Sequence, residues 1–262
     1  MHIATNGVKL AVRDQGNGPV AIVYLHYWGG SSRTWQPVIA AMPEGCRHVA
    51  LDLRGWGDSD KPDGDVALAD LACDVAGVVD ALGLERYVLV GHSMGGKVAQ
   101  LLAGGRPRGL CGLALVAPAP PLPLQLTDEQ RGAMRMAYRD EHTVAATLDA
   151  ALTAHPLPAP LRRQVIEDSL RGSLAARDAW LDEGVRADIA QAARNIDVPV
   201  LVLSGEHDRV DPPAALRAHL LPVIPQARLQ IVPGCGHLLP LEAPQAVAGA
   251  IDGFVRGLEP AA

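Results

Sequence analysis

Short apolar runs that alternate with helical patterns limit the folds open to this sequence more than any other feature. Helical patterns cover residues 67–82 and 97–103, and strands that alternate with helices form right-handed crossovers onto a parallel sheet. We therefore predict an α/β fold with a mostly parallel central sheet flanked by helices. The runs that we interpret as buried strands are 20–25, 48–51, 87–90, 113–116, 200–203 and 229–232.

The beginning of the chain has a different pattern. Asn6-Gly7 lies between two short alternating runs, which is typical of a two-residue type I′ hairpin turn. We therefore expect an antiparallel hairpin ahead of the parallel strands. The whole sequence has 262 residues, 48% of them hydrophobic and 20% charged. This composition is typical of a single globular domain with a substantial core, so we predict one domain over residues 1–262.

A long stretch without strands interrupts the alternation between about residues 118 and 197. Thr127 is followed by acidic residues, which is typical of a helix N-cap. We interpret the stretch as a helical insertion that caps the active site, because ligands of open α/β sheets bind beyond the carboxyl ends of strands. Ordinary peripheral helices are the alternative interpretation. The segments with helical composition are 128–142, 143–153, 161–170 and 174–193.

The charge of the chain excludes several classes of partner. The formal net charge is −6, whereas nucleic acids and anionic membranes require clustered Lys and Arg. The first fifteen residues carry Lys9, Arg13 and Asp14, which leaves no apolar core for a secretory signal. We therefore expect a cytoplasmic protein that acts on a small molecule. The four cysteines have no CxxC spacing, so we predict neither a metal site nor a disulfide framework.

The strongest chemical signal is a serine between two glycines. The predicted strand 87–90 runs into Gly91-His92-Ser93-Met94-Gly95-Gly96 and then directly into a helical pattern. Such a strand-turn-helix junction is the context of a nucleophile elbow, where glycines allow a tight turn and the serine stands exposed. The helix N-terminus also favours a developing oxyanion. We therefore interpret Ser93 as a nucleophile.

A serine nucleophile needs a histidine base and an orienting carboxylate. His237 follows the last predicted strand in the glycine-rich segment Gly234-Cys235-Gly236-His237, where a flexible loop can present the ring over the sheet edge. Three carboxylates follow the preceding strand, and spacing alone does not choose among them. They are Glu206, Asp208 and Asp211.

Together these motifs resemble those of the α/β-hydrolase family, in the order Ser, acid, His. The segment 52–59, DLRGWGDS, is similar to the family's D-x-R-G-x-G-x-S loop, and Gly236-His237 matches the histidine loop. Gly205-Glu206-His207-Asp208 resembles the family's G-x-x-D acid motif, which selects Asp208. The resemblance covers nearly the whole chain outside the insertion, and it implies the α/β-hydrolase fold with Ser93, Asp208 and His237 as catalytic residues.

The resemblance also implies an oxyanion hole made of the backbone N–H groups of Trp28 and Met94. The family's loop here reads H-G-x-x-G, whereas this chain has His26-Tyr27-Trp28-Gly29-Gly30. Tyr27 stands where glycine is usual, and its bulk restricts the backbone angles of the loop. The predicted substrate pocket contains residues of this loop, of the elbow and of the insertion. They are His26, Tyr27, Trp28, His92, Met134, Met136 and Trp180, with core packing as the alternative role of the insertion residues.

We predict a cofactor-independent serine hydrolase that cleaves small carboxylic esters through an acyl-enzyme intermediate. Within the family the same catalytic triad also serves lactonases, carbon-carbon bond hydrolases and cofactor-free perhydrolases, also called non-haem haloperoxidases. The Trp28 loop and the Gly-His-Ser-Met-Gly-Gly motif resemble the perhydrolase branch. A ligand receptor on the same scaffold is a rival, although a binding protein has no chemical need for all three catalytic groups. The acyl-chain preference and the oligomeric state stay open.

Overall fold

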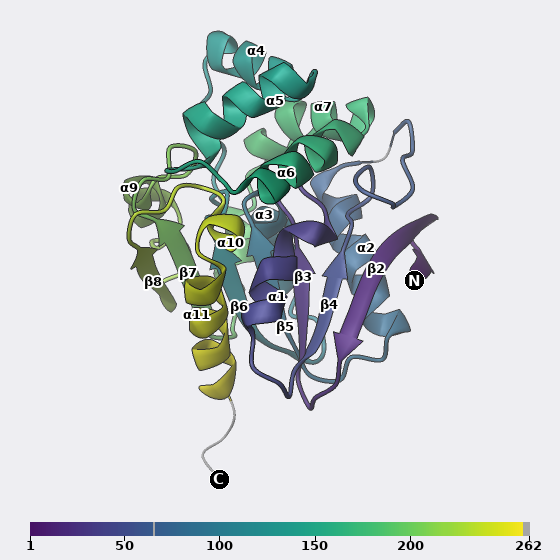
Figure 1. Cartoon of the computed structure of the whole chain (residues 1–262). Helices are drawn as coiled ribbons and strands as arrows, with labels where there is room; N and C mark the ends of the chain where they lie inside the picture. Colours follow the sequence, from purple (N-terminus) through teal and green to yellow (C-terminus); the bar gives the residue numbers. More distant parts are fainter. Residues whose placement is uncertain (65, 259–262) are drawn as a thin grey trace.

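The computed structural model describes residues 1–64 and 66–258, so residue 65 and the last four residues of the predicted domain lie outside the described residues. Within the described chain, eight strands form one sheet in the order β1-β2-β4-β3-β5-β6-β7-β8 (Figure 1). The strands are β1 (His2–Thr5), β2 (Val8–Gly16), β3 (Ala21–Leu25), β4 (Arg47–Leu51), β5 (Tyr87–His92), β6 (Leu110–Val116), β7 (Val200–Gly205) and β8 (Ala227–Val232).

The strand directions confirm the predicted sheet. β1 and β2 are antiparallel, and the turn between them has positive φ at both Asn6 (43°) and Gly7 (79°), as a type I′ turn requires. β2 is also antiparallel to β4, whereas every pairing from β4 through β3, β5, β6 and β7 to β8 is parallel. The carboxyl ends of β3 to β8 therefore meet at one edge of the sheet.

Helices cover both faces of this sheet, because successive side chains of a strand point to opposite faces. Ile22 and Tyr24 of β3 pack into one core cluster with α1 (Gln36–Ala41) and α11 (Pro244–Arg256). Ala21, Val23 and Leu25 pack into the other with α2 (Leu68–Ala81) and α3 (Met94–Gly104). In Figure 1, α1 and α11 lie in front of the sheet and α2 and α3 lie behind it.

The segment between β6 and β7, residues 117–199, is called the helical insertion here, and its described residues include no strand. Its helices α4 to α7 lie above the carboxyl ends of the central strands (Figure 1). The Thr127 side chain accepts the backbone N–H of Gln130 at 3.1 Å and caps α4. The helices are α4 (Asp128–Met136), α5 (Glu141–Thr147), α6 (Ala159–Arg171), α7 (Leu174–Asp182) and α8 (Ala190–Arg194), with a π-helical turn over Leu148–Leu152 and a 3₁₀ turn over Gly184–Arg186.

Two of the predicted helices are divided in the structure. The predicted helix 128–142 ends at Met136, because Asp140 caps a new helix by accepting the backbone N–H of Thr143 at 2.9 Å. The predicted helix 174–193 is interrupted by the 3₁₀ turn over Gly184–Arg186.

Short elements complete the fold: a 3₁₀ helix over Ser32–Trp35, α9 (Pro213–His219) and α10 (Leu239–Glu242). No helix in the described ranges is long and apolar enough to span a membrane.

A buried ion pair joins three separate segments of the fold. The Arg54 guanidinium donates two hydrogen bonds of 2.6 Å to the Asp74 carboxylate, and both side chains are almost fully buried. Arg54 also donates to the backbone carbonyl of Asn6 at 3.0 Å, and the Asn6 amide donates to Asp74 at 3.1 Å. The pair therefore ties the first hairpin and the loop after β4 to α2.

We expect Asp74→Ala to lower the free energy of unfolding by about 3–5 kcal/mol, because it leaves the Arg54 charge buried without its carboxylate. Asp252→Ala is the matched control, since it breaks the exposed pair with Arg256 on α11 and costs less than about 1 kcal/mol. Urea unfolding curves of the two variants measure both values. Equal losses of stability would show that the Arg54–Asp74 pair contributes no more than a surface pair.

Candidate active site

Ser93 makes the turn between β5 and α3 by itself. Its backbone has φ 52° and ψ −114°, a conformation that is costly for any residue except glycine. The Ser93 N–H donates to the carbonyl of Val116 on β6 at 3.1 Å, and the Ser93 carbonyl accepts the N–H of Ala119 at 3.1 Å. Hydrogen bonds to the neighbouring strand and to the segment after it therefore hold the strained turn.

Two glycines beside Ser93 allow the backbone to pack closely. A Cβ on Gly91 would lie 2.4 Å from the carbonyl oxygen of Gly95, and a Cβ on Gly95 would lie 2.5 Å from that of His26. A side chain at Gly91 would open the elbow turn itself, and one at Gly95 would force the elbow and the loop after β3 apart. Gly95 therefore brings the elbow against the loop of residues 26–30.

His237 lies on the loop after β8, and its ring is hydrogen-bonded to one of the three candidate carboxylates. His237 Nδ1 and Asp208 Oδ2 are 2.9 Å apart, and both side chains are almost completely buried. The other Asp208 oxygen accepts the backbone N–H groups of Val210 at 2.8 Å and Asp211 at 3.0 Å. Glu206 is exposed and accepts the N–H of Gly234 instead. Spacing alone left this choice open and the family resemblance selected Asp208, and the hydrogen bond to His237 distinguishes the same residue from its neighbours.

The charges of this pair depend on each other. Burial by itself would lower the pKa of His237, but the charge of Asp208, the hydrogen bond to it and the carboxylates of Asp211 and Glu242 outweigh burial, so the pKa of His237 is raised. Burial raises the pKa of Asp208, but His237 and the two backbone N–H donors outweigh it, so the pKa of Asp208 is lowered. The pair therefore favours a charged Asp208 and makes the His237 ring a stronger base.

Ser93 and His237 open on the same cavity, which has a volume of about 400 Å³. Its lining is mainly apolar and comes from the loop after β3, the elbow, the loops after β7 and β8, and the helical insertion. Of the predicted pocket residues, Tyr27, Trp28, Met134 and Trp180 line it.

The structure corrects the predicted pocket at three residues, which do not line the cavity. Met136 is 45% exposed, because it lies two positions after Met134 and so faces another side of α4. His26 is enclosed in the core, where its Nε2 lies 3.0 Å from the Leu53 N–H and accepts it. His92 is enclosed as well, with Nε2 2.9 Å from the carbonyl of His237. The two histidines position loops instead of facing the cavity.

The loop of residues 26–30 accommodates Tyr27 without strain. Tyr27 is not among the described residues with positive φ, so its backbone does not need the conformational freedom of glycine. Its ring packs 5.1 Å from the His92 ring. The carbonyl of Trp28 accepts the indole N–H of Trp56 at 2.5 Å. Within the described chain, neither the Trp28 N–H nor the Met94 N–H donates to another group, so both remain available to a ligand.

Two residues that the sequence analysis did not single out also shape the site. The Tyr138 ring lines the cavity and packs 4.4 Å from the Trp28 ring. Glu242 accepts the N–H of Ala154 at 2.7 Å with one oxygen and that of Gly236 at 3.0 Å with the other. Glu242 therefore ties the histidine loop to the helical insertion. The signal in the sequence that could have identified Glu242 is its position five residues after His237.

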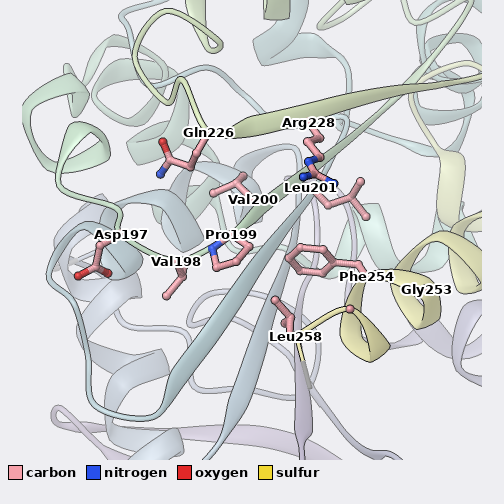
Figure 2. A pocket seen from close by; sticks show the side chains of 11 residues that line it. Asp197, Val198, Pro199, Val200, Leu201, Gln226, Arg228, Gly253, Phe254 and Leu258 are labelled. Atoms are coloured by element: carbon pink, nitrogen blue, oxygen red, sulfur yellow. The ribbon is translucent and has the colours of Figure 1, made fainter. Parts of the chain in front are cut away.

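A second cavity, of about 510 Å³, lies at the opposite end of the sheet, where β7 and β8 begin and α11 ends (Figure 2). Leu201 and Phe254 line it together with Asp197 and Arg228. Asp197 pairs with Arg106 at 3.3 Å on the surface. The described residues that line this cavity include no serine, cysteine or histidine, so the site at the elbow is the candidate active site. No group of three or more His, Cys, Asp or Glu among the described residues could hold a metal ion.

Comparisons with known proteins show to which family this fold belongs. The chain is 28% identical over 259 residues to the 2-(acetamidomethylene)succinate hydrolase of Mesorhizobium japonicum, covering 95% of this chain and 92% of that protein. It is 29% identical over 252 residues to a non-heme haloperoxidase of Rhodococcus erythropolis, covering 89% and 91%. The structure of a thermophilic esterase from Thermogutta terrifontis is similar, with TM-score 0.82, 26% identity and 99% of each chain covered. Residues 22–250 match the sequence profile of the Alpha/beta hydrolase family, and the chain belongs to this family.

Proposed function

We propose that this protein is a serine hydrolase that cleaves small carboxylic esters through an acyl-enzyme intermediate. One observation carries the proposal: a strained, cavity-facing Ser93 and a buried His237–Asp208 pair open on the same cavity. In the proposed mechanism Ser93 Oγ attacks the ester carbonyl and His237 Nε2 takes its proton. The protonated ring then gives this proton to the departing alcohol, and a water molecule repeats the sequence to release the acid.

Asp208 has a positioning and electrostatic role in this mechanism. Its hydrogen bond at Nδ1 favours the tautomer whose Nε2 lone pair is free to accept the serine proton. Its charge stabilises the imidazolium that forms during each proton transfer. Asp208 stays ionised throughout, which is consistent with its lowered pKa.

The oxyanion of the tetrahedral intermediate is assigned to the backbone N–H groups of Trp28 and Met94. Two features support this assignment: both N–H groups are available, and Met94 begins α3, whose N-terminus favours negative charge. Each such donor contributes about 10²–10³ in kcat in enzymes of this type.

The helical insertion is proposed to cap the acyl-binding part of the cavity within a single catalytic domain. Met134 and Trp180 reach the cavity from the insertion, and its mainly apolar lining suits an aliphatic or aromatic acyl group. The relative named as an esterase supports an ester substrate.

A second reaction on the same residues is favoured by the relative named as a non-heme haloperoxidase. Hydrogen peroxide would replace water as the acceptor of the acyl group, which forms a peracid and regenerates Ser93. This perhydrolase reaction uses the same acyl-enzyme.

Ser93→Ala tests the proposed nucleophile. We expect kcat for p-nitrophenyl butanoate to fall by about 10⁴–10⁶, because the acyl-enzyme can no longer form and only binding and the oxyanion hole remain. Ser204→Ala makes the same exchange at another buried serine and is the matched control, with kcat expected within a few-fold of wild type. A folded Ser93→Ala variant with comparable activity would exclude Ser93 as the nucleophile.

The pH dependence tests the His237–Asp208 pair. His237 accepts a proton only when neutral, so kcat/KM is expected to fall as the pH falls through its pKa, with the midpoint above 6.5 because that pKa is raised. Asp208→Asn removes the charge and the correct tautomer, which should move the midpoint down and cost about 10⁴ in kcat. Asp211→Asn should cost far less for an unsubstituted acyl ester. Equal losses of kcat in Asp208→Asn and Asp211→Asn would refute the assignment of Asp208.

Met134 and Met136 provide a matched pair for the insertion. Met134→Ala enlarges the cavity, so we expect the preferred acyl chain of p-nitrophenyl esters to lengthen and KM for short esters to rise. Met136→Ala, on the exposed side of the same helix, should leave the chain-length profile unchanged. Identical profiles in both variants would contradict a role of the insertion in acyl binding.

A further inference from the structure

A carboxyl group lines the candidate active-site cavity without a partner of its own. Asp211 follows Asp208 by three residues, and its N–H donates to Asp208 Oδ1 at 3.0 Å. The residue is only 2% exposed, and it is part of the cavity lining with Ser93 and His237. Its carboxyl oxygens form no hydrogen bond or ion pair with any described residue. A buried carboxyl group in this state is costly unless something hydrogen-bonds to it.

Three other polar side chains of the cavity lining have partners within the protein. Thr147 donates to the carbonyl of Ala137, and Arg209 donates to that of Ala150. Gln130 accepts the N–H of Thr127 in the cap of α4. The Tyr27 hydroxyl and the Trp28 indole N–H have none among the described residues, but both atoms are enclosed by protein and do not reach the cavity. Asp211 is the one carboxyl group among the described residues that line the cavity, and its hydrogen-bonding capacity is unused.

A buried lysine behind the cavity influences the charge of Asp211. Lys97 lies on α3, is completely buried, and its ammonium has no hydrogen-bond partner among the described residues. Burial raises the pKa of Asp211 to about 7 and lowers that of Lys97 to about 8, while the charge of each group opposes the shift of the other. At neutral pH and above, Lys97 therefore favours the ionised carboxylate, which is the stronger hydrogen-bond acceptor.

We infer that Asp211 is a specificity-determining residue that selects acyl groups carrying a hydroxyl or N–H donor. The inference rests on the proposed ester hydrolysis and names its substrate class. The apolar lining binds the carbon chain, and the donor of the substrate satisfies the unpaired carboxylate. A substrate without a donor leaves Asp211 buried and unpaired, and one with a second carboxylate is repelled. Sites that need a hydrogen bond from the substrate discriminate more strongly than apolar pockets.

The test compares p-nitrophenyl hexanoate with its 3-hydroxy and 6-hydroxy derivatives. For each enzyme the measured quantity is the ratio of kcat/KM for the hydroxylated ester to that for the plain ester. The fraction of active protein cancels in this ratio, so partial misfolding of a variant does not affect it. We expect the wild type to prefer at least one hydroxylated ester by about tenfold.

The decisive variant combines Asp211→Leu with Lys97→Met, which removes the acceptor and avoids leaving a lone buried ammonium. Its ratio should fall to 1 or below, because hexanoate gains an apolar contact and the hydroxyl loses its acceptor. Asp211→Asn keeps the shape with a weaker acceptor and should give an intermediate ratio. Asp188→Asn is the matched control: Asp188 also acts on the charge of Lys97, but it is exposed and lies outside the cavity lining, so the ratio should stay at the wild-type value.

Three results would overturn the inference: no preference in the wild type, a preference that survives in the double variant, or an equal loss in Asp188→Asn. In each case Ser93-dependent hydrolysis of hexanoate would leave the proposed function intact. If the wild type hydrolyses none of the three esters, or if Ser93→Ala hydrolyses them equally well, the proposed function itself fails and the inference with it.

Discussion

The close contact between the elbow and the loop after β3 is the constraint on which the rest of the site depends. Gly95 packs against the carbonyl of His26, so α3 starts where β3 ends. This contact brings the Ser93 turn and the Trp28 and Met94 N–H groups to one edge of the sheet. The strain at Ser93 persists because β6 and its following segment accept and donate hydrogen bonds on both sides of it. Backbone packing therefore sets the positions of Ser93 and of both N–H groups.

The helical insertion is tied to the same loop. Asp168 of α6 accepts the Ser31 hydroxyl at 2.9 Å, and Ser169 donates to the carbonyl of Gly29 at 3.0 Å. Burial raises the pKa of Asp168 to about 6, against the charge of Arg33 and the hydrogen bond from Ser31, which lower it. The hydrogen bonds of Asp168 and Ser169 hold α6 directly against the loop. The cavity roof and the predicted oxyanion loop consequently form one packed unit, and a shift of α6 would displace both.

The sequence predicted the parts of this structure that local patterns determine. The short apolar runs that alternate with helical patterns and the Asn6-Gly7 turn predicted the sheet correctly, and the glycines around Ser93 predicted the elbow. Spacing could not choose among Glu206, Asp208 and Asp211, because the choice depends on how the loop after β7 folds toward β8. The resemblance of residues 205–208 to the family's acid motif selected Asp208. The helix over residues 128–142 was predicted as continuous, although Asp140 and Thr143 form a capping box that begins α5. His26 was assigned to the pocket because enclosure by the Leu53 loop leaves no local signature.

Three carboxylates surround His237, and their different partners explain how one site tolerates them. Asp208 binds the ring, and Glu242 accepts two backbone N–H groups, so both charges are compensated by donors. Asp211 has no such donor and depends on the distant charges of Lys97 and His237. Asp208 and Glu242 therefore have their partners within the protein, which are the His237 ring for Asp208 and backbone N–H groups of the histidine loop and the insertion for Glu242. The negative charge of Asp211 has no hydrogen-bond donor among the described residues. Asp211 would therefore gain more than Asp208 or Glu242 from a donor on a bound molecule, and for this reason we assign substrate recognition to it.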